Sequence, residues 1–172
     1  SRVKAALTGA SVVVYVGRGY GYPSPGSTVL RRESHGGFGL NPVAGVNNTR
    51  VKFYGERYIR GLALSKSAVV ILSHARYAPG IGASGSASPS LATARRRVDN
   101  YGAGFLAAGA SAVIAEMTAS PVYYVRTIFT RTLTLDAMWR AAPSRHGHVT
   151  SFKSTRTAGA IGRTDPVRSR SG

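Results

Sequence analysis

The chain contains no cysteine, which excludes disulfide bonds, cysteine-ligated metal sites and thiol catalysis in the sequence as it stands. Acidic residues are also scarce, because 6 Asp and Glu stand against 23 Lys and Arg. The pair of facing carboxylates that glycosidases use therefore has little support. No apolar run approaches the ~20 residues of a membrane-spanning helix, so no membrane span is expected. The first ten residues lack the apolar core of a signal peptide, as a mature or trimmed chain also would.

The sequence does contain enough apolar residues for a folded domain and a large excess of positive charge. Its 172 residues are 43% hydrophobic, which suits a single domain with a real core. The formal net charge of +17 favours polyanionic partners such as nucleic acid, anionic lipid headgroups or acidic cell-wall polymers. The alternative is that the charge only keeps the protein soluble, because the arginines are scattered and no nucleic-acid-binding motif surrounds them.

Apolar patterning predicts alternating strands and helices. Runs of β-branched residues predict buried strands at Ser11–Val16, Ala68–Leu72 and Ser111–Ala115, with a short edge strand at Val149–Phe152. Helices are predicted at Arg2–Leu7, Tyr54–Ala63, Leu91–Ala108, Pro121–Thr130 and Thr134–Ala142, with Ser90 and Thr134 as N-caps. This order favours an α/β fold with a mostly parallel sheet and flanking helices.

The same patterns divide the chain into one domain and a tail. Residues 1–154 are expected to form a single α/β domain. Residues 155–172 are basic and lack periodicity, so we expect a tail that is mobile or ordered only against a partner. Only three clear buried strands are present and the chain begins inside a helix, so we expect the domain to lack an N-terminal strand.

Two strand ends draw attention to one edge of the predicted sheet. The run VVVYVGRGY at Val12–Tyr20 and the run AVVILSHARYAPG at Ala68–Gly80 both pass from a buried strand into a loop containing glycine. In open parallel sheets ligands bind where such loops converge. The loop glycines are Gly17, Gly19 and Gly80. The polar residues at this edge include Arg18 and Arg76, where a base and a nucleophile would be expected.

Two common site types find little support. Glycines after a strand can bind a phosphate when a helix follows, but Pro23 and Pro25 follow the GRGYG loop here. His146 and His148 flank a glycine without a nearby carboxylate, and two ligands do not make a metal site. We therefore expect neither a cofactor nor a metal.

His74 is a different case, because it lies at the carboxyl end of a buried strand. A structural histidine is the favoured interpretation. Ser73 is adjacent, but neighbouring side chains on an extended strand face opposite ways, which argues against a serine hydrolase. A residual hydrolase that uses His74 with Ser73, His35 or Glu116 remains an alternative.

The order of these segments resembles the caspase-like fold, and CHAT-type peptidase domains in particular. In that family one strand ends in a His-Gly motif, a later strand ends in a Cys-containing stretch, and an F-L-x-A-G-A helix leads into an A-V-I-A strand. The corresponding segments here are VVVYVGRG at Val12–Gly19, VVILSHARYAPG at Val69–Gly80 and GFLAAGASAVIAE at Gly104–Glu116. The resemblance implies a three-layer α/β sandwich.

The chain is more closely similar to a group of actinobacterial proteins that are usually secreted. That similarity covers the chain from about Val3 to Asp165 and suggests export or a cell-surface location. The motifs that carry it are GRGYGYPSPG at Gly17–Gly26, GFGLNP at Gly37–Pro42, KFYGE at Lys52–Glu56, SHARYAPG at Ser73–Gly80 and RVDNYGAGFLAAGASAVIAE at Arg97–Glu116.

The chain departs from the family pattern at both catalytic positions. Arg18 stands at the His position and Arg76 at the Cys position. In the family mechanism the histidine activates the cysteine thiolate, which attacks a peptide carbonyl. A guanidinium group is permanently protonated and serves neither role. The resemblance therefore implies a catalytically inactive domain that serves as a binding or structural module.

Two further interpretations stay open. Arg18 and Arg76 could together bind an anion, since guanidinium pairs well with carboxylate and phosphate, or both could simply extend into solvent. The alternative function from a different class is a polyanion-binding protein that uses the net charge to bind nucleic acid or acidic cell-wall polymers.

Overall fold

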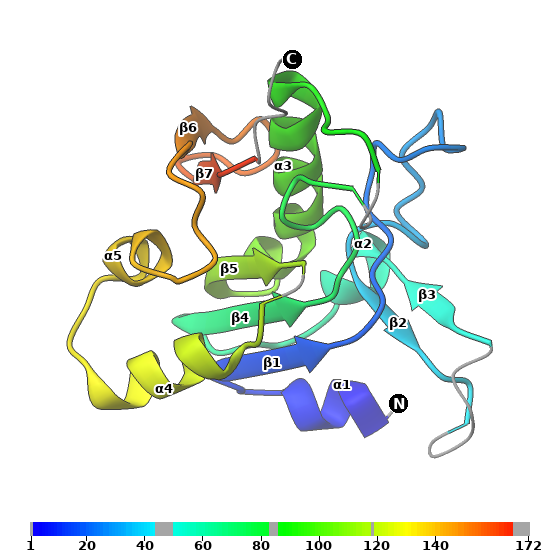
Figure 1. Cartoon of the computed structure of the whole chain (residues 1–172). Helices are drawn as coiled ribbons and strands as arrows, with labels where there is room; N and C mark the ends of the chain where they lie inside the picture. Colours follow the sequence, from blue (N-terminus) through cyan, green and yellow to red (C-terminus); the bar gives the residue numbers. More distant parts are fainter. Residues whose placement is uncertain (1, 44–49, 83–85, 118, 167–172) are drawn as a thin grey trace.

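The computed structural model describes residues 2–43, 50–82, 86–117 and 119–166. Its centre is a parallel three-stranded sheet in the order β1-β4-β5 (Figure 1). The strands of this sheet are β1 (Val12–Val16), β4 (Ala68–Ser73) and β5 (Ala110–Glu116). Two antiparallel pairs lie outside it, β2 (Phe38–Leu40) with β3 (Lys52–Tyr54) and β6 (Thr150–Lys153) with β7 (Ile161–Thr164). The predicted α/β class and parallel sheet are confirmed.

Helices cover both faces of the sheet. They are α1 (Arg2–Leu7), α2 (Glu56–Ile59), α3 (Leu91–Ala107), α4 (Val122–Thr130) and α5 (Leu135–Arg140). Figure 1 shows α3 on one side of the sheet and α4 and α5 on the other. The molecule is thus built in three layers.

The core consists of two apolar clusters separated by β4, whose six residues are all buried. Alternate side chains of a strand point to opposite faces. Val70 and Leu72 pack into the cluster that contains Tyr101 and Phe105 of α3. On the other face, Val69 and Ile71 join Tyr124 and Met138 of α4 and α5; this second cluster also contains Ile114 and Ala142. Burial on both faces explains why β4 reads as a continuous apolar run.

Both predicted helix caps are present. The Ser90 side chain accepts a hydrogen bond from the Thr93 N–H at 3.2 Å, and α3 begins at the next residue. The Thr134 side chain accepts one from the Ala137 N–H at 3.1 Å at the start of α5. The long elements follow the predicted ranges to within two residues at each end.

The predicted helix over Tyr54–Ala63 is wrong in extent. Its first residue belongs to β3, which pairs with β2, and α2 is a single turn at Glu56–Ile59. Gly55 separates the two elements and lies close to the chain at His35. A side chain at Gly55 would come within 2.6 Å of three backbone atoms, including the His35 nitrogen. The chain at His35 therefore leaves no room for a side chain between the strand and the helix.

The structure also differs from the expected tail. Residues 155–166 include β7, which pairs with β6, and Arg156, which donates to both carboxylate oxygens of Glu56 at 2.8 Å. The Asp165 carboxylate accepts hydrogen bonds from the backbone N–H groups of His146 and His148. These contacts join distant parts of the chain, so local periodicity does not reveal them. The rest of the expected tail, residues 167–172, lies outside the described residues.

Candidate functional site

The two strand ends singled out by the sequence lie next to each other. Val16 of β1 pairs in register with Ser73 of β4, and the Gly17 N–H donates to the Ser73 carbonyl at 3.0 Å. Ser73 is also in register with Glu116 at the end of β5. The loops that follow all three strands therefore leave the same edge of the sheet, which is the edge where parallel sheets bind ligands.

The loop glycines at this edge serve close packing. A Cβ atom on Gly19 would collide with the Tyr101 hydroxyl and lie 2.9 Å from the Ala75 Cβ. Gly80 has a φ of +93° and a Cβ there would lie 3.0 Å from the Ala94 carbonyl oxygen. The loops after β1 and β4 can pack against each other and against α3 because these residues lack side chains.

Arg18 and Arg76 are both exposed at this edge. The Arg18 carbonyl accepts hydrogen bonds from the Gly39 N–H at 2.9 Å and the Tyr15 hydroxyl at 2.8 Å, which holds its backbone in place. Within the part of the chain that the structure describes, neither guanidinium group has a hydrogen-bond or ion-pair partner. Both side chains point to solvent and both are available to an anion.

Ser73 and His74 do not face opposite ways, contrary to the expectation from the sequence. The Ser73 Oγ lies 2.9 Å from the His74 Nδ1 and also donates to the Ala119 carbonyl at 3.2 Å. The reason is that β4 ends at Ser73 and His74 has a φ of +64°, so strand alternation no longer applies. His74 is exposed, whereas Ser73 has an exposed fraction of 0%. A substrate carbonyl could not reach the Ser73 hydroxyl.

Glu116 is buried close to this pair but is bound to other groups. Its Oε1 accepts hydrogen bonds from the Tyr124 hydroxyl and from Arg145. Burial raises the pKa of Tyr124, and the hydrogen bond to Glu116 raises it further. Among the described residues no hydrogen bond joins the Glu116 carboxylate to His74, which contacts Glu116 only through the backbone, at 3.0 Å from its N–H to the carbonyl. Ser73, His74 and Glu116 therefore do not form a hydrogen-bonded catalytic triad.

His35 belongs to the packing of the loop region. It is 1% exposed, its Nδ1 accepts the Arg31 N–H at 2.8 Å, and its ring lies 4.5 Å from that of Tyr20. Burial lowers the pKa of His35, and the charge of Arg31 lowers it further. These are contacts of a neutral structural histidine. Across the described ranges, no three His, Asp or Glu side chains are grouped closely enough to hold a metal ion.

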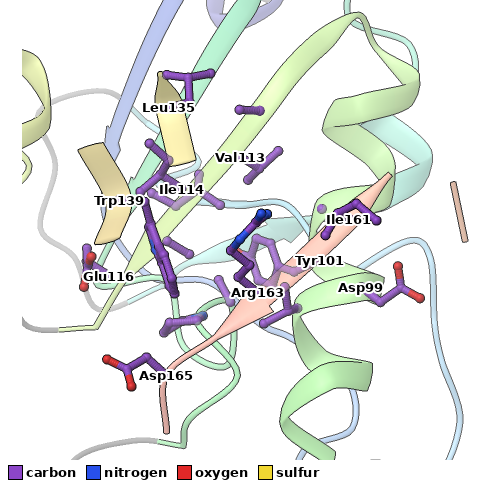
Figure 2. A pocket seen from close by; sticks show the side chains of 18 of the residues that line it. Asp99, Tyr101, Val113, Ile114, Glu116, Leu135, Trp139, Ile161, Arg163 and Asp165 are labelled. Carbon is purple, nitrogen blue, oxygen red and sulfur yellow. The ribbon is translucent and has the colours of Figure 1, made fainter. Parts of the chain in front are cut away.

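The structure contains a second candidate site that was not predicted from the sequence. A cavity of about 540 Å³ lies beside β5, between α3, α5 and β7 (Figure 2). Its lining residues come from eight separate stretches of the chain between Leu72 and Asp165, so no local motif marks it.

Comparison with known proteins identifies no relative, because no family model, curated protein or solved structure matches the chain. Within residues 2–166, apart from the three gaps, no helix is both long enough and apolar enough to cross a membrane.

Proposed function

We propose that the chain is a caspase-like domain without peptidase activity that binds an anionic group at the carboxyl edge of its sheet. Arg18 and Arg76 are the proposed ligands. Support comes from one observation: both arginines follow hydrogen-bonded neighbouring strands, both are exposed, and neither guanidinium group has a partner among the described residues. The resemblance of the strand-end motifs to CHAT-type domains supplies the caspase-like part of the proposal.

The chemistry at these positions favours binding over catalysis. A guanidinium group stays protonated at every physiological pH, so Arg18 cannot act as a general base. Two exposed guanidinium groups can form bidentate hydrogen bonds with a carboxylate or phosphate. The buried Ser73 hydroxyl offers no accessible nucleophile beside them. The ligand class is therefore a carboxylate or phosphate group presented by a partner or small molecule.

Calorimetric titration with inorganic pyrophosphate tests the anion site. The double variant Arg18→Ala/Arg76→Ala should bind at least tenfold more weakly than the parent chain, since each charge-assisted pair contributes ~1.5 kcal/mol or more. The control is Arg2→Ala/Arg131→Ala, which removes two exposed arginines elsewhere and makes the same change in net charge. Equal losses in the two double variants would show that only overall charge matters and would overturn the site.

Reversion of both arginines to the family residues tests the caspase-like part of the proposal separately. In the double variant Arg18→His/Arg76→Cys, a caspase-like geometry places an imidazole where it can lower the pKa of the new thiol. At pH 6.5 iodoacetamide should then react at least tenfold faster with this variant than with Arg76→Cys alone. Equal rates in two folded variants would mean that the positions do not form a catalytic pair.

A second candidate is polyanion binding through the whole surface, and one observation favours it. All six carboxylates have partners within the chain. Glu33, Glu56, Glu116 and Asp136 pair with seven arginines, while Asp99 and Asp165 accept hydrogen bonds from neutral groups. The remaining positive charge therefore has little acidic surface to offset it.

Salt dependence separates the two candidates. A single-stranded DNA 20-mer should lose affinity by 10²-fold or more between 50 and 200 mM salt if the general charge binds it. Binding that is weak and insensitive to salt would exclude this function. If Arg18 and Arg76 contact the DNA, replacing both with alanine should make the slope of log affinity against log salt shallower by about 1.4. Each lost phosphate contact on a single strand accounts for ~0.7 of this change.

Residual hydrolysis is the third alternative. The contact between Ser73 and His74 supports it, whereas the burial of the Ser73 hydroxyl counts against it. Turnover of p-nitrophenyl acetate that disappears in His74→Ala would support it. Turnover that survives His74→Ala, or no turnover above buffer, would remove it.

A further inference from the structure

The cavity lies between the open edge of β5 and β7, of which Ile161, Gly162 and Arg163 line it. Seven consecutive residues, Ser111–Met117, form one wall, which shows that the cavity runs along the edge of β5. Val98 and Leu106 of α3 line one side, and Leu135 and Trp139 of α5 line the other. The two helical layers therefore extend past the last strand of the sheet. Figure 2 shows Trp139, Ile161 and Arg163 gathered around this space.

The edge of β5 that lines the cavity has unpaired backbone groups. The Glu116 carbonyl accepts the His74 N–H, so the backbone of Glu116 points toward β4. Backbone groups alternate along a strand, and those of Ala115 and Val113 therefore point away from β4 and into the cavity. Among the described residues β5 has β4 as its only neighbour in the sheet, and no backbone hydrogen bond reaches these outward groups.

The charge of the cavity is opposite to that of the whole chain. Four of the six acidic residues line it together with only two arginines, Arg145 and Arg163, which gives a formal net charge of −2 with histidine neutral. The acidic residues are Asp99, Glu116, Asp136 and Asp165. Each arginine pairs with one carboxylate, Arg145 with Glu116 and Arg163 with Asp136 at 2.7 Å. Asp136 also pairs with Arg140 at 3.1 Å, which lies outside the lining, so the net charge of −2 belongs to the lining residues alone.

Two of these carboxylates have no cationic partner among the described residues. Asp99 accepts hydrogen bonds from the Ser154 hydroxyl and from the N–H and hydroxyl of Thr155. Asp165 accepts the backbone N–H groups of His146 and His148. A carboxylate has about four acceptor positions, so both retain capacity for a further donor. Figure 2 shows these two carboxylates on opposite sides of the cavity, at its rim, so cationic groups near the two ends of a bound segment would meet negative charge that has no ion-pair partner.

We propose that this cavity binds an extended, basic polypeptide segment of a partner protein, which adds to β5 as a fourth strand. The outward N–H and C=O groups of Val113 and Ala115 recur at strand spacing, as strand addition requires. At ~3.3 Å per residue, Ser111–Met117 offers about 20 Å of edge. Alternate side chains of the segment enter the apolar walls at Trp139 and Tyr101, and its lysine or arginine side chains meet the unpaired carboxylates.

Short synthetic peptides test the proposal on the full chain. The probe is a fluorescein-labelled peptide of alternating valine and lysine, six residues long. One control replaces lysine by glutamate, and the other carries N-methyl groups on alternate backbone nitrogens. We expect the lysine peptide to bind, and each control to bind at least tenfold more weakly. The net charge of +17 works against this result, because general attraction would favour the glutamate peptide.

Changes on the protein locate the binding. In ¹H–¹⁵N spectra of the parent chain the amide signals of Val113 and Ala115 should shift on addition of the lysine peptide, while that of Val14 in β1 should not. The variant Ala115→Pro lacks one outward N–H, a loss that an edge strand tolerates, and should bind at least tenfold more weakly.

Four outcomes would overturn the proposal. They are absence of binding by the lysine peptide, equal binding by the glutamate peptide, equal binding by the N-methylated peptide, and self-association of the parent chain that Ala115→Pro abolishes. Self-association that Ala115→Pro abolishes would show that a second copy of the chain, and not a partner peptide, pairs with the edge of β5. None of these results depends on Arg18 or Arg76, so the anion site stands or falls separately.

Discussion

Glu56 is buried against arginines from three parts of the sequence. It is 0% exposed and lies 2.8 Å from Arg60, 2.8 Å from Arg156 and 3.7 Å from Arg32. Burial alone would raise the pKa of Glu56, but the hydrogen bonds from Arg60 and Arg156 and the nearby charges of Arg156 and Arg32 outweigh it and hold the pKa below its usual range. One carboxylate thus links α2 to the segment after β6.

Replacing this carboxylate should destabilise the fold. Glu56→Gln leaves Arg156 largely buried without a counter-charge, which costs about 3 kcal/mol or more of the free energy of unfolding. Urea denaturation of the parent and the variant measures it. The matched control is Glu33→Gln, which removes an exposed pair with Arg57 at 3.6 Å and should change stability by less than about 0.5 kcal/mol. Equal effects of the two substitutions would contradict this account.

The same residue predicts a pH dependence. Because the pKa of Glu56 is lower in the folded chain than in the unfolded chain, its ionised form stabilises the fold above the unfolded value of about 4.3. That stabilisation is lost as the pH falls through the lower, folded pKa. The difference in stability between the parent and Glu56→Gln should therefore narrow steadily below about pH 4.3. A difference that stays constant to pH 2 would refute the lowered pKa.

His74 shows where inference from adjacent residues fails. Its position after a buried strand was predicted from the apolar run, and the structure has it there. Its contact with Ser73 was not predicted, because that contact depends on a positive φ at a residue that is not glycine. Such conformations are uncommon and have no marker in the sequence. The sequence did predict that the loops carrying Arg18 and Arg76 lie at the same edge of the sheet, because the carboxyl ends of neighbouring parallel strands meet there.

Elements with long, repeated patterns were predicted well, and the short elements α1 and β6 were also predicted, but β2, β3 and the extent of α2 were not. The continuous apolar run of β4 and the helical period of α3 each carry enough residues to define the element. The strands β2 and β3 have three residues each, and α2 has four. Their conformation depends on contacts made elsewhere, such as that of Gly55 with the loop at His35. A pattern search along the chain does not contain this information.

The N-cap residue of α3, Ser90, should contribute measurably to the stability of the fold. α3 contributes both to the core and to the wall of the cavity, and Ser90 satisfies one of its first N–H groups. Ser90→Ala should lower the free energy of unfolding by about 1 kcal/mol. Thermal denaturation measures it, with the exposed Ser86→Ala as the control, which should change stability by less than about 0.5 kcal/mol. A larger effect of Ser86→Ala would mean that the cap is unimportant.

At the scale of the whole molecule, the chain folds as one unit through contacts that span it. Arg156 reaches Glu56 across 100 residues of sequence, and Ser154 and Thr155 bind Asp99 of α3. The sequence pattern ends the domain at residue 154, because no local feature marks residues 155–166 as part of it. The integration of residues 155–166 is a property of the assembled fold.

Truncation tests this integration. A chain that ends after Ser154 lacks β7 and Arg156, so β6 loses its partner strand and Glu56 loses an ion pair. We expect its melting temperature to fall by at least 10 °C, since ~1 kcal/mol corresponds to a few degrees in a domain of this size. A chain that ends after Pro166 keeps every one of these contacts and should melt close to the parent. Similar melting of both truncated chains and the parent would show that the segment contributes little.

The recessed edge of β5 has a consequence for self-assembly. An unpaired strand at the rim of a sheet normally invites other sheets and promotes fibre formation. Here the layers carrying Trp139 and Leu106 project beyond that rim. In the proposed complex a single extended chain enters between these layers, and we expect the helices carried by another folded sheet to clash with them. On this proposal the flanking helices admit an unfolded segment and keep two folded copies from joining into a growing fibre.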